Sequence, residues 1–401
     1  LCDRWPNLRE AVTLVTAGAL GLIVINIYLR LQAGAVLAID LAEPLPGLTL
    51  RLEVEPLGML FALVAGVLWL ITSIYAIGYM RGLHEHDQTR YFSFFALSLS
   101  ATVGVAFSAN LLTLYLFYEL LTLSTYPLVT HHQDEEARSS GRKYLFFILG
   151  SSIGMILPAM LFIALKTGTL EFTPQGIVED RISGPAASFL VLLFVFGFAK
   201  AAVMPFHAWL PAAMVAPTPV SALLHAVAVV KVGVFFVVRM LTGIFGIGWL
   251  DSLELSTLIC GVAALTIIVS SLIALNADGL KRRLAFSTIG QLSYIILGVA
   301  LLSKSGMVGG LLHIGMHAFG KITLFFCAGA IFVATGVTSI SQMVGIGKRM
   351  PLTMSAFFVG ALSVIGLPPC GGFISKWHLV LGTVEAGQFL MLGILLVSSL
   401  L

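Results

Sequence analysis

Four lysines and one glutamate lie within apolar stretches of a chain that otherwise carries little charge: Glu119, Lys200, Lys231, Lys321 and Lys376. A charged side chain at the centre of a bilayer costs about 2.5–3.5 kcal/mol on insertion scales, so such residues are rare and usually functional. Lysine and glutamate can each take up and release a proton. The pattern therefore predicts a path for protons through a membrane.

Histidines accompany two of these lysines. His225 precedes Lys231 by six residues, which is too far for direct contact along a helix, although water could connect the two. His313, His317 and Lys321 follow one another at a spacing of four, so they lie near one helical face, about 6 Å apart, a spacing suited to proton hopping through water. Histidines four apart could also bind a metal ion, but no third carboxylate or cysteine ligand is apparent, and we expect neither metal nor cofactor.

Glu119 needs a partner from another helix, because no compensating charge is near it in sequence. Lys200 is the natural candidate. At 4 Å and an effective dielectric constant near 20, the two charges would attract by about 4 kcal/mol before desolvation is subtracted. Opening the pair would change how strongly the lysine holds its proton, so the pair would act as a switch. A static buried ion pair is the alternative.

The composition requires a membrane to hold these residues. Of the 401 residues, 58% are hydrophobic and 10% are charged, whereas soluble domains have about 25% charged residues. The mean hydropathy is +1.02. Apolar runs of about 20 residues, enough to cross a core of about 30 Å, recur along the chain. We expect an all-α polytopic membrane protein with about twelve transmembrane helices, at residues 10–31, 57–79, 92–109, 110–130, 143–165, 186–209, 218–243, 255–275, 284–302, 307–335, 352–382 and 386–401.

The chain ends, the cysteines and the net charge limit the class of protein further. The chain begins with Leu1 rather than Met and stops at Leu401 inside an apolar run, so we expect both ends to lie within a longer protein. The four cysteines form no CxxC pair that would predict a redox cluster. The net charge of +3 is spread over loops and gives no argument for nucleic acid.

Basic residues in short loops predict the orientation. If the loops alternate, four basic groups fall on one side, which the positive-inside rule makes cytoplasmic. The opposite side holds Arg51, Lys166, Arg181 and Lys304, with Arg239 near a helix end. A polar run at 131–136, His-His-Gln-Asp-Glu-Glu, lies on the basic side and is expected to be a solvated loop. The four basic groups are Arg81 with Arg90; Arg138, Arg142 with Lys143; Lys281, Arg282 with Arg283; and Lys348 with Arg349.

Two proline clusters, at 204–211 and 366–372, interrupt apolar spans. Proline removes a backbone donor and clashes with the preceding turn, so we expect both helices to break, with Lys200 just before the first break and Lys376 just after the second. Broken helices in two halves indicate inverted repeats. We expect two five-helix repeats, at 92–243 and 255–401, after N-terminal helices and an external hairpin within 1–91. Simple kinks in packing helices are the alternative.

At these residues the chain resembles the antiporter-like membrane subunits of Mrp-type cation/proton antiporters, respiratory complex I and membrane-bound hydrogenases. The matching segments are Tyr-Glu-Leu at 118–120, Pro-Phe-His-Ala-Trp-Leu-Pro at 205–211, Ala-Pro-Thr-Pro-Val-Ser-Ala-Leu-Leu-His at 216–225 and Gly-Phe-Ile-Ser-Lys at 372–376. The resemblance implies a family fold of about fourteen helices. Its ion-pair glutamate and lysine fall on Glu119 and Lys200, and its central lysine falls on Lys231.

The resemblance further implies that the second-half positions fall on His313, His317 and Lys321, and the terminal lysine on Lys376. One complex I subunit class has glutamate there, so lysine, with the Pro6–Ala11 start, makes the chain look most like the D-type subunit of an Mrp-type antiporter. The implied partners are other membrane subunits, the lipid bilayer, protons and Na⁺, in the inner (plasma) membrane. Protons would enter toward Lys231 and leave near Lys376, gated by the Glu119 pair. A redox-driven pump and an inactive scaffold are the competing readings.

Overall fold

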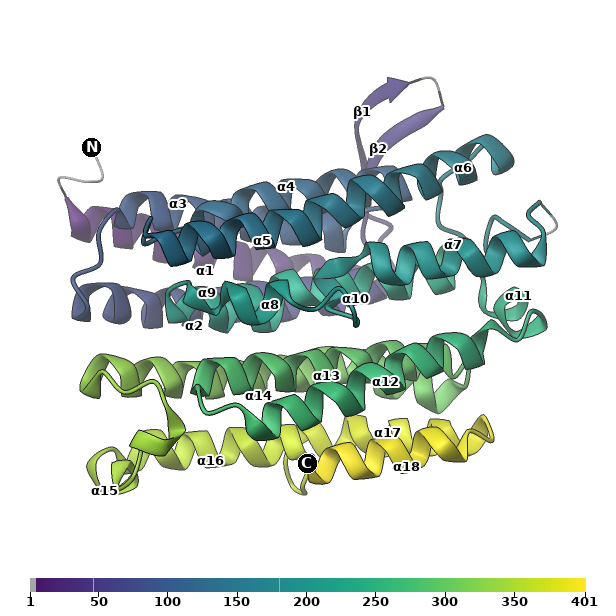
Figure 1. Cartoon of the computed structure of the whole chain (residues 1–401). Helices are drawn as coiled ribbons and strands as arrows, with labels where there is room; N and C mark the ends of the chain where they lie inside the picture. The colour runs from purple at the N-terminus through teal and green to yellow at the C-terminus, as the bar shows by residue number, and fades with distance from the viewer. Residues whose placement is uncertain (1–4, 46, 180) are drawn as a thin grey trace.

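The computed structural model describes residues 5–45, 47–179 and 181–401. Long helices lie side by side and run back and forth between two ends of the molecule (Figure 1). This architecture follows from the composition, because a chain inside lipid must satisfy every backbone polar group internally, and a helix does so within one segment.

The first third of the chain holds three helices and one hairpin. Helix α1 is Pro6–Gln32, α2 is Pro56–Gly82 and α3 is Gln88–Ala106. Strands β1 (Ala38–Leu45) and β2 (Leu48–Glu53) pair antiparallel, which confirms the expected hairpin. These are the only strands in the part of the chain that the structure describes.

The rest of the described chain is helical, with several short or irregular turns between longer helices. Three π-helical turns, at Ser152–Ile156, Ser221–Ala228 and Met240–Phe245, and three 3₁₀ turns, at Ala199–Ala201, Ala213–Val215 and Ile340–Gln342, join or interrupt them. The helices are α4 (Leu111–Val129), α5 (Glu135–Ser151), α6 (Leu157–Thr167), α7 (Gly184–Gly197), α8 (Trp209–Ala212), α9 (Thr218–Val220), α10 (Val229–Arg239), α11 (Ile247–Ser252), α12 (Leu255–Asn276), α13 (Leu280–Ala300), α14 (Lys304–Thr335), α15 (Ile346–Arg349), α16 (Pro351–Ile365), α17 (Gly371–Glu385) and α18 (Phe389–Leu400).

Eight helical segments of the described chain are long and apolar enough to cross a membrane. Three shorter apolar helices, α7, α16 and α18, add to them. The multi-pass helical class is therefore confirmed, and each expected span contains helix. The expected number of twelve crossings depends on how the shorter helices are counted, and it stays a prediction. The long segments are Pro6–Gln32, Pro56–Gly82, Leu111–Val129, Glu135–Thr167, Thr218–Phe245, Leu255–Asn276, Leu280–Ala300 and Lys304–Thr335.

The four basic groups share one end of the bundle, as the alternation of loops predicts. The α2–α3 loop, the start of α5, the start of α13 and α15 all lie at the left end of Figure 1. The hairpin lies toward the other end, where Arg51 also belongs, since the backbone of Arg51 and Glu53 bonds to the α3–α4 connection. Which end faces the cytoplasm remains a prediction.

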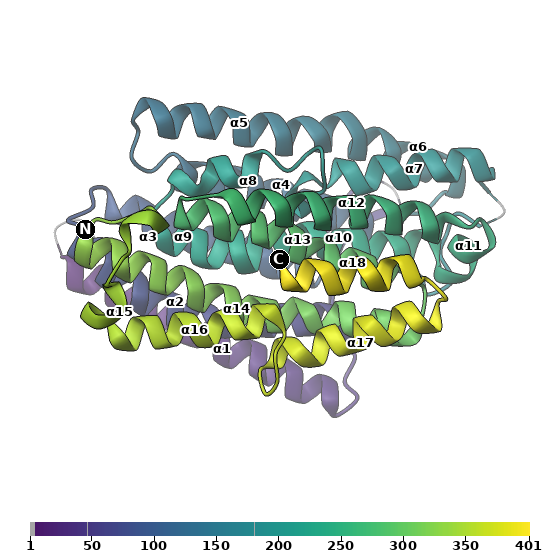
Figure 2. The ribbon, with the colours of Figure 1, turned by 60° about the horizontal axis from the view of Figure 1, so that its bottom comes forward.

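Both proline clusters interrupt helices, as expected. Helix α7 stops at Gly197, and α16 and α17 are separated by the loop at 366–370 and follow one another lengthwise (Figure 2). One detail of the prediction is wrong: Lys200 lies inside the first break, in the 3₁₀ turn, rather than just before it. Lys376 lies in the second turn of α17. The inverted repeats at 92–243 and 255–401 remain a proposal.

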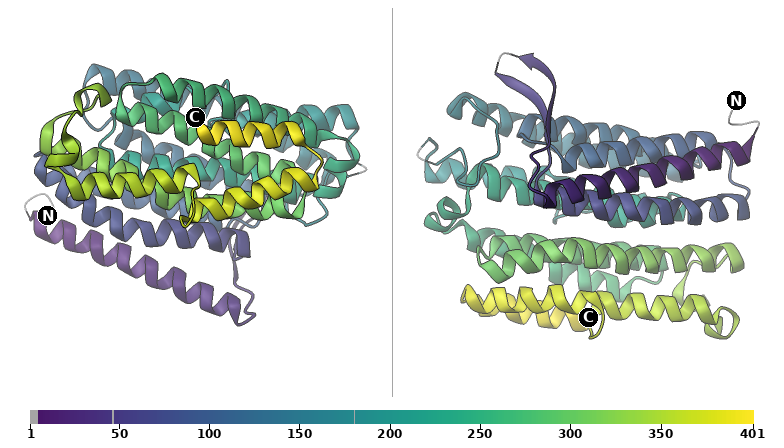
Figure 3. Two further views of the ribbon diagram at one scale, coloured as in Figure 1. Left: turned by 90° about the horizontal axis from the view of Figure 1, so that it is seen from below. Right: turned by 180° about the vertical axis from the view of Figure 1, so that it is seen from behind.

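Two halves of the bundle meet near the middle of the molecule. Seen from behind, helices of the N-terminal half lie above α12–α18 (Figure 3, right). Helix α10 of the first half contacts α13, and the turn before α10 contacts α14. Residues on α10 and α14 can therefore meet across the boundary, far from either end of the bundle.

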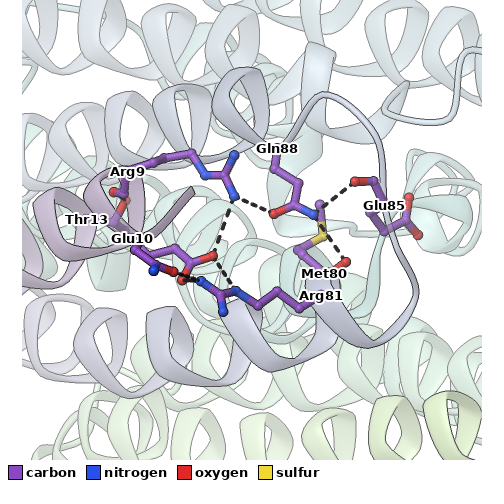
Figure 4. Close-up of polar contacts among 8 residues, drawn as sticks. Arg9, Glu10, Thr13, Met80, Arg81, Glu85 and Gln88 are labelled. Carbon is purple, nitrogen blue, oxygen red and sulfur yellow. Dashed lines mark hydrogen bonds and ion pairs between the residues drawn. The ribbon is translucent and has the colours of Figure 1, made fainter. Parts of the chain in front are cut away.

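A polar cluster fixes α1 to α2 at the basic end (Figure 4). The guanidinium of Arg81 donates to both carboxylate oxygens of Glu10, at 2.8 and 2.5 Å. Arg9 Nη2 donates to Gln88 Oε1 at 2.6 Å, and Gln88 Nε2 donates to the Glu85 carbonyl at 3.0 Å. These contacts hold the α2–α3 loop in one position.

The polar run at 131–136 is only partly the solvated loop that the sequence predicts. Asp134 accepts a hydrogen bond from the Ala137 amide at 2.7 Å and caps α5, and the two glutamates lie in the first turn of that helix. His131 differs, because its side chain is completely buried. The α2–α3 loop packs over it, which local sequence does not reveal.

Candidate functional site

A lysine and a histidine meet where the two halves of the bundle join. Lys231 Nζ on α10 is in hydrogen-bond contact with His317 Nδ1 on α14. Both side chains are buried, and every residue of α10 from Val229 to Arg239 is buried as well. A hydrogen bond needs one donor and one acceptor, so the two nitrogens share a proton rather than each holding one toward the other.

His313 continues the contact along α14. Its ring stacks on that of His317, with centroids 5.6 Å apart and an interplanar angle of 22°. One ring nitrogen, Nδ1, lies 2.9 Å from Ser375 Oγ on α17, and Nε2 lies 2.9 Å from Gln291 Oε1 on α13. The predicted helical stripe is therefore present for the two histidines, and His313 links three helices.

Lys376 follows Ser375 directly on α17. Its amine donates to the Ile365 carbonyl at 3.0 Å, across the helix break, and to Ser399 Oγ on α18 at 2.9 Å. It also lies 5.0 Å from the ring centre of Tyr294, where a cation is attracted to the π face. Lys376 is only partly buried, and it lines a mainly apolar groove of about 290 Å³.

These residues form one connected series, the central polar chain: Lys231, His317, His313, Ser375 and Lys376. It crosses from α10 through α14 to α17, roughly across the bundle rather than along it. Each neighbouring pair is joined by a hydrogen bond, a ring stack or the peptide chain. The sequence predicts four of its five members.

Lys321 lies apart from this chain although it shares α14. Its amine donates to the Leu284 carbonyl in the second turn of α13, at 3.2 Å. The side chain is buried, and no hydrogen bond joins it to His317 within the described residues. The expected three-residue stripe is therefore present as spacing on one helix. Among the described residues, the ring stack joins the two histidines, and no hydrogen bond joins Lys321 to either of them.

Lys200 does not pair with Glu119 in this structure. Its amine donates to the Tyr118 carbonyl at 2.5 Å and to Thr122 Oγ1 at 2.8 Å, and lies 3.4 Å from the centre of the Tyr118 ring. Within the described residues, neither carboxylate oxygen of Glu119 accepts a hydrogen bond of good geometry. The direct ion pair expected from sequence is open here, because neutral oxygens on α4 already satisfy the buried amine.

Glu119 remains within the electrostatic reach of Lys200. Its polar neighbours are Thr122 and Ser152. Ser152 begins the π-helical turn between α5 and α6, a kind of irregularity that is frequent at functional sites. Glu119 is only half-buried as a residue, but both of its carboxylate oxygens are shielded from the surface.

Aromatic rings pack together beside Lys200. Phe198 and Phe236 stack with centroids 3.6 Å apart, and Tyr118 meets both rings edge-on. Within the described residues, no hydrogen bond joins Lys200 to Lys231. The candidate site therefore has two parts, which no hydrogen bond joins within the described residues.

His225 is the remaining predicted site residue, and its side chain lies outside the described part of the structure. Its backbone belongs to the π-helical turn Ser221–Ala228 that leads into α10. Its proposed role beside Lys231 stays a prediction.

Sequence reasoning missed several neutral members of the site: Thr122, Gln291, Tyr294, Ser375 and Ser399. A signal existed for Gln291, which is an amide within the apolar run 284–302, and for Ser375, which adjoins Lys376. Serine, threonine and tyrosine are common in apolar helices, so type alone does not single out the others.

Comparison with known proteins gives the family. The family model described as NADH:quinone oxidoreductase/Mrp antiporter, TM, matches residues 108–401. The chain is 35% identical over 357 residues to NADH-quinone oxidoreductase subunit N of Desulforudis audaxviator (strain MP104C), covering 88% of this chain and 70% of that protein. It is 31% identical over 360 residues to Na(+)/H(+) antiporter subunit A1 of Staphylococcus aureus (strain bovine RF122 / ET3-1), covering 85% of this chain but only 44% of that protein.

A solved structure agrees with these relatives. The Mrp complex from Dietzia sp. DQ12-45-1b contains a chain that superposes with a TM-score of 0.88 at 25% identity, covering 98% of this chain and 72% of that one. The family model covers well over half of the chain and includes all eight predicted site residues. This chain therefore belongs to the NADH:quinone oxidoreductase/Mrp antiporter family and is a multi-pass, antiporter-like membrane subunit.

Proposed function

We propose that this chain is a proton-translocating subunit, of the D type, in a multisubunit Mrp-type Na⁺/H⁺ antiporter of the inner (plasma) membrane. The observation that carries the proposal is the central polar chain, which runs through an otherwise apolar interior. Buried ionisable groups in contact with one another, inside a membrane bundle, are the usual basis of a proton relay.

The contacts support a lateral transfer. A proton that reaches Lys231 passes to His317 Nδ1 through the hydrogen bond between them. From His317 the proton reaches His313 through water, since the two rings are stacked and no hydrogen bond joins them within the described residues, and the bond of His313 to Ser375 leads to α17 and Lys376. Moving one charge through the full membrane potential is worth about 2.3 kcal/mol per 100 mV, so modest electrostatic changes can drive such a cycle.

Lys200 and Glu119 supply the gate in this proposal. In the open arrangement the Lys200 amine is held by Tyr118 and Thr122. Closing the pair requires the amine to leave these oxygens for the Glu119 carboxylate. The two arrangements differ in where the positive charge of Lys200 lies, and that difference is what would bias Lys231.

A redox-driven pump is the second candidate, favoured by the 35% identity to a subunit of an NADH-quinone oxidoreductase. The same relay would then be driven by chemistry in other subunits. Optical and metal analysis of the complex, purified in mild detergent through a tag on this chain, separates the two. Flavin absorbance with several irons per complex supports the redox reading, and their absence, with only small membrane subunits present, supports the antiporter.

A substitution tests the relay in either case. His317→Asn removes the ring nitrogen that contacts Lys231. We expect proton transport by the reconstituted complex, followed with a pH-sensitive dye, to fall at least about tenfold, because a positioned acid–base group commonly contributes a factor of about 10²–10⁴. His378→Asn is the control, because His378 is a histidine of α17 that lies outside the central polar chain. Equal transport rates for wild type and His317→Asn would refute the relay.

A further inference from the structure

A second cluster of ionisable side chains lies at the basic end of the bundle, away from the central polar chain. Glu85 and His86 belong to the α2–α3 loop, and His131 follows the end of α4. Each offers one ligand atom, and these atoms all lie within 4.8 Å of one another. The cluster takes no part in the proposed relay, so a ligand bound here would have a role separate from the relay.

His131 is the least expected member. Its side chain is 0% exposed, yet neither ring nitrogen has a hydrogen-bond partner among the described residues. Leaving a buried polar group unpaired costs about 1–3 kcal/mol. Its Nε2 lies 3.7 Å from Glu85 Oε2, so the ring is aimed into the cluster. The ring of His86 stacks on it, with centroids 4.9 Å apart and an interplanar angle of 4°.

Neighbouring groups orient the side chains of Glu85 and His86 and hold the backbone of His131. His132 Nε2 lies 3.3 Å from the other oxygen of Glu85, and Asp87 Oδ2 lies 3.0 Å from His86 Nδ1. Arg90 donates to the His131 carbonyl at 3.0 Å. Carboxylates, carbonyls and imidazoles placed around the binding residues in this way are typical of metal sites, where outer contacts fix the ligand rings.

The loop that carries Glu85 is itself held in place. Gln88 binds the Glu85 carbonyl and is bound in turn by Arg9, while the Glu85 carboxylate points away from that network (Figure 4). The carboxylate is thus free of the arginines of α1 and α2 and is available to the histidines.

We propose that Glu85, His86 and His131 bind one divalent transition-metal ion of the zinc class. Two imidazoles and one carboxylate match the ligands that zinc takes in sites with an open fourth position, whereas Mg²⁺ and Ca²⁺ prefer oxygen ligands throughout.

The geometry needs a rotation of the His86 ring, because a metal ion lies in the plane of each imidazole that binds it and His86 is stacked parallel on His131. Two bonds of about 2.1 Å at a tetrahedral angle place ligand atoms about 3.4 Å apart. The atoms of His131 and Glu85 are 3.7 Å apart already, and the exposed His86 can move toward them. An ion here joins the α2–α3 loop to the end of α4.

Titration of the purified complex with ZnCl₂ in metal-free buffer tests the proposal, with binding heats measured for the wild type and variants in the same complex. We expect one zinc per chain that is lost, or weakened at least about tenfold, in Glu85→Gln and in His86→Asn. His84→Asn is the matched control, since His84 lies in the same loop and outside the cluster. His86 is on the surface, so its variant keeps the test valid if a change at buried His131 prevents folding.

X-ray absorption at the zinc edge gives a second readout. The site is supported if the wild type shows two imidazole ligands at the zinc and if His86→Asn loses this signal together with the binding heat. Zinc binding by Glu85→Gln and His86→Asn that equals the wild type overturns it. Displacement of zinc by millimolar Mg²⁺ overturns the class of ion.

Discussion

At the scale of single residues, the buried amines of this chain are satisfied mainly by neutral oxygens and imidazoles instead of carboxylates. Lys200 binds a carbonyl and a hydroxyl, Lys321 a carbonyl, and Lys376 a carbonyl and a hydroxyl. A carboxylate partner would hold the proton on an amine by direct attraction. Neutral partners solvate the amine without that attraction, which suits a group that must release its proton.

Thr122 tests this arrangement at Lys200. We expect Thr122→Val to lower the free energy of unfolding by about 1.5–3 kcal/mol, the range for a hydrogen bond to a charged group, because the amine loses its only side-chain acceptor among the described residues. Thermal unfolding in mild detergent measures it, and Thr122→Ser should restore the stability.

Thr72→Val is the control for that experiment, since this buried hydroxyl bonds to the Leu68 carbonyl of its own helix. Equal losses for the two valine variants would show that the hydroxyl of Thr122 has no special role.

The residue types at the site could be predicted from sequence, but their partners could not. Charge and imidazole in an apolar run identify Lys231 and His317 without any structure. The expected direct contact of Glu119 with Lys200 is open in this structure, because the break after α7 brings Lys200 onto the Tyr118 carbonyl, and no local pattern encodes that. The burial of His131 was missed for the same reason, since its cover comes from a different loop.

At the scale of elements, broken helices place the lysines. Proline spacing predicts both breaks, since an apolar run with adjacent prolines cannot remain one helix. What it does not predict is how closely α10 approaches the first break. Gly233 of α10 packs against the backbone of Lys200 and Ala201, so the two lysine-bearing segments are in contact through a residue without a side chain.

Gly233→Ala therefore tests the packing of α10 on the break. A Cβ at this position would come within 2.7 Å of Ala201 Cα, and backbone atoms cannot rotate away. We expect destabilisation by about 1–3 kcal/mol, the usual cost of overpacking, together with loss of transport. Both are measured on the purified complex, by thermal unfolding and by proton uptake.

Gly261→Ala is the matched change in α12, where no atom of the described chain lies within 4 Å of the added Cβ. Alanine is the better helix former, so this variant should be neutral or more stable by about 0.5–1 kcal/mol. Wild-type stability and transport in Gly233→Ala would mean that the break tolerates displacement and does not position Lys200.

At the scale of the whole molecule, charge is sorted between two ends while the relay crosses the middle. The basic groups gather at one end, and the central polar chain lies at the boundary between the two halves of the bundle (Figures 1 and 3). Sequence could predict the sorting, because loop charges are local. It could not predict the boundary, because the contact of Lys231 with His317 joins residues 86 positions apart.

The orientation of these ends gives the last prediction. By the positive-inside rule the basic end faces the cytoplasm. In a chain whose four native cysteines are replaced by serine, Lys348→Cys should react with a membrane-impermeant maleimide only in inside-out vesicles, and Lys304→Cys only in right-side-out ones. Both lysines are exposed, and they lie at opposite ends of the bundle, so each serves as the control for the other. The reverse pattern would show that the basic end faces the outer side and would contradict the predicted orientation, and labelling of both from one side would contradict the helix alternation itself.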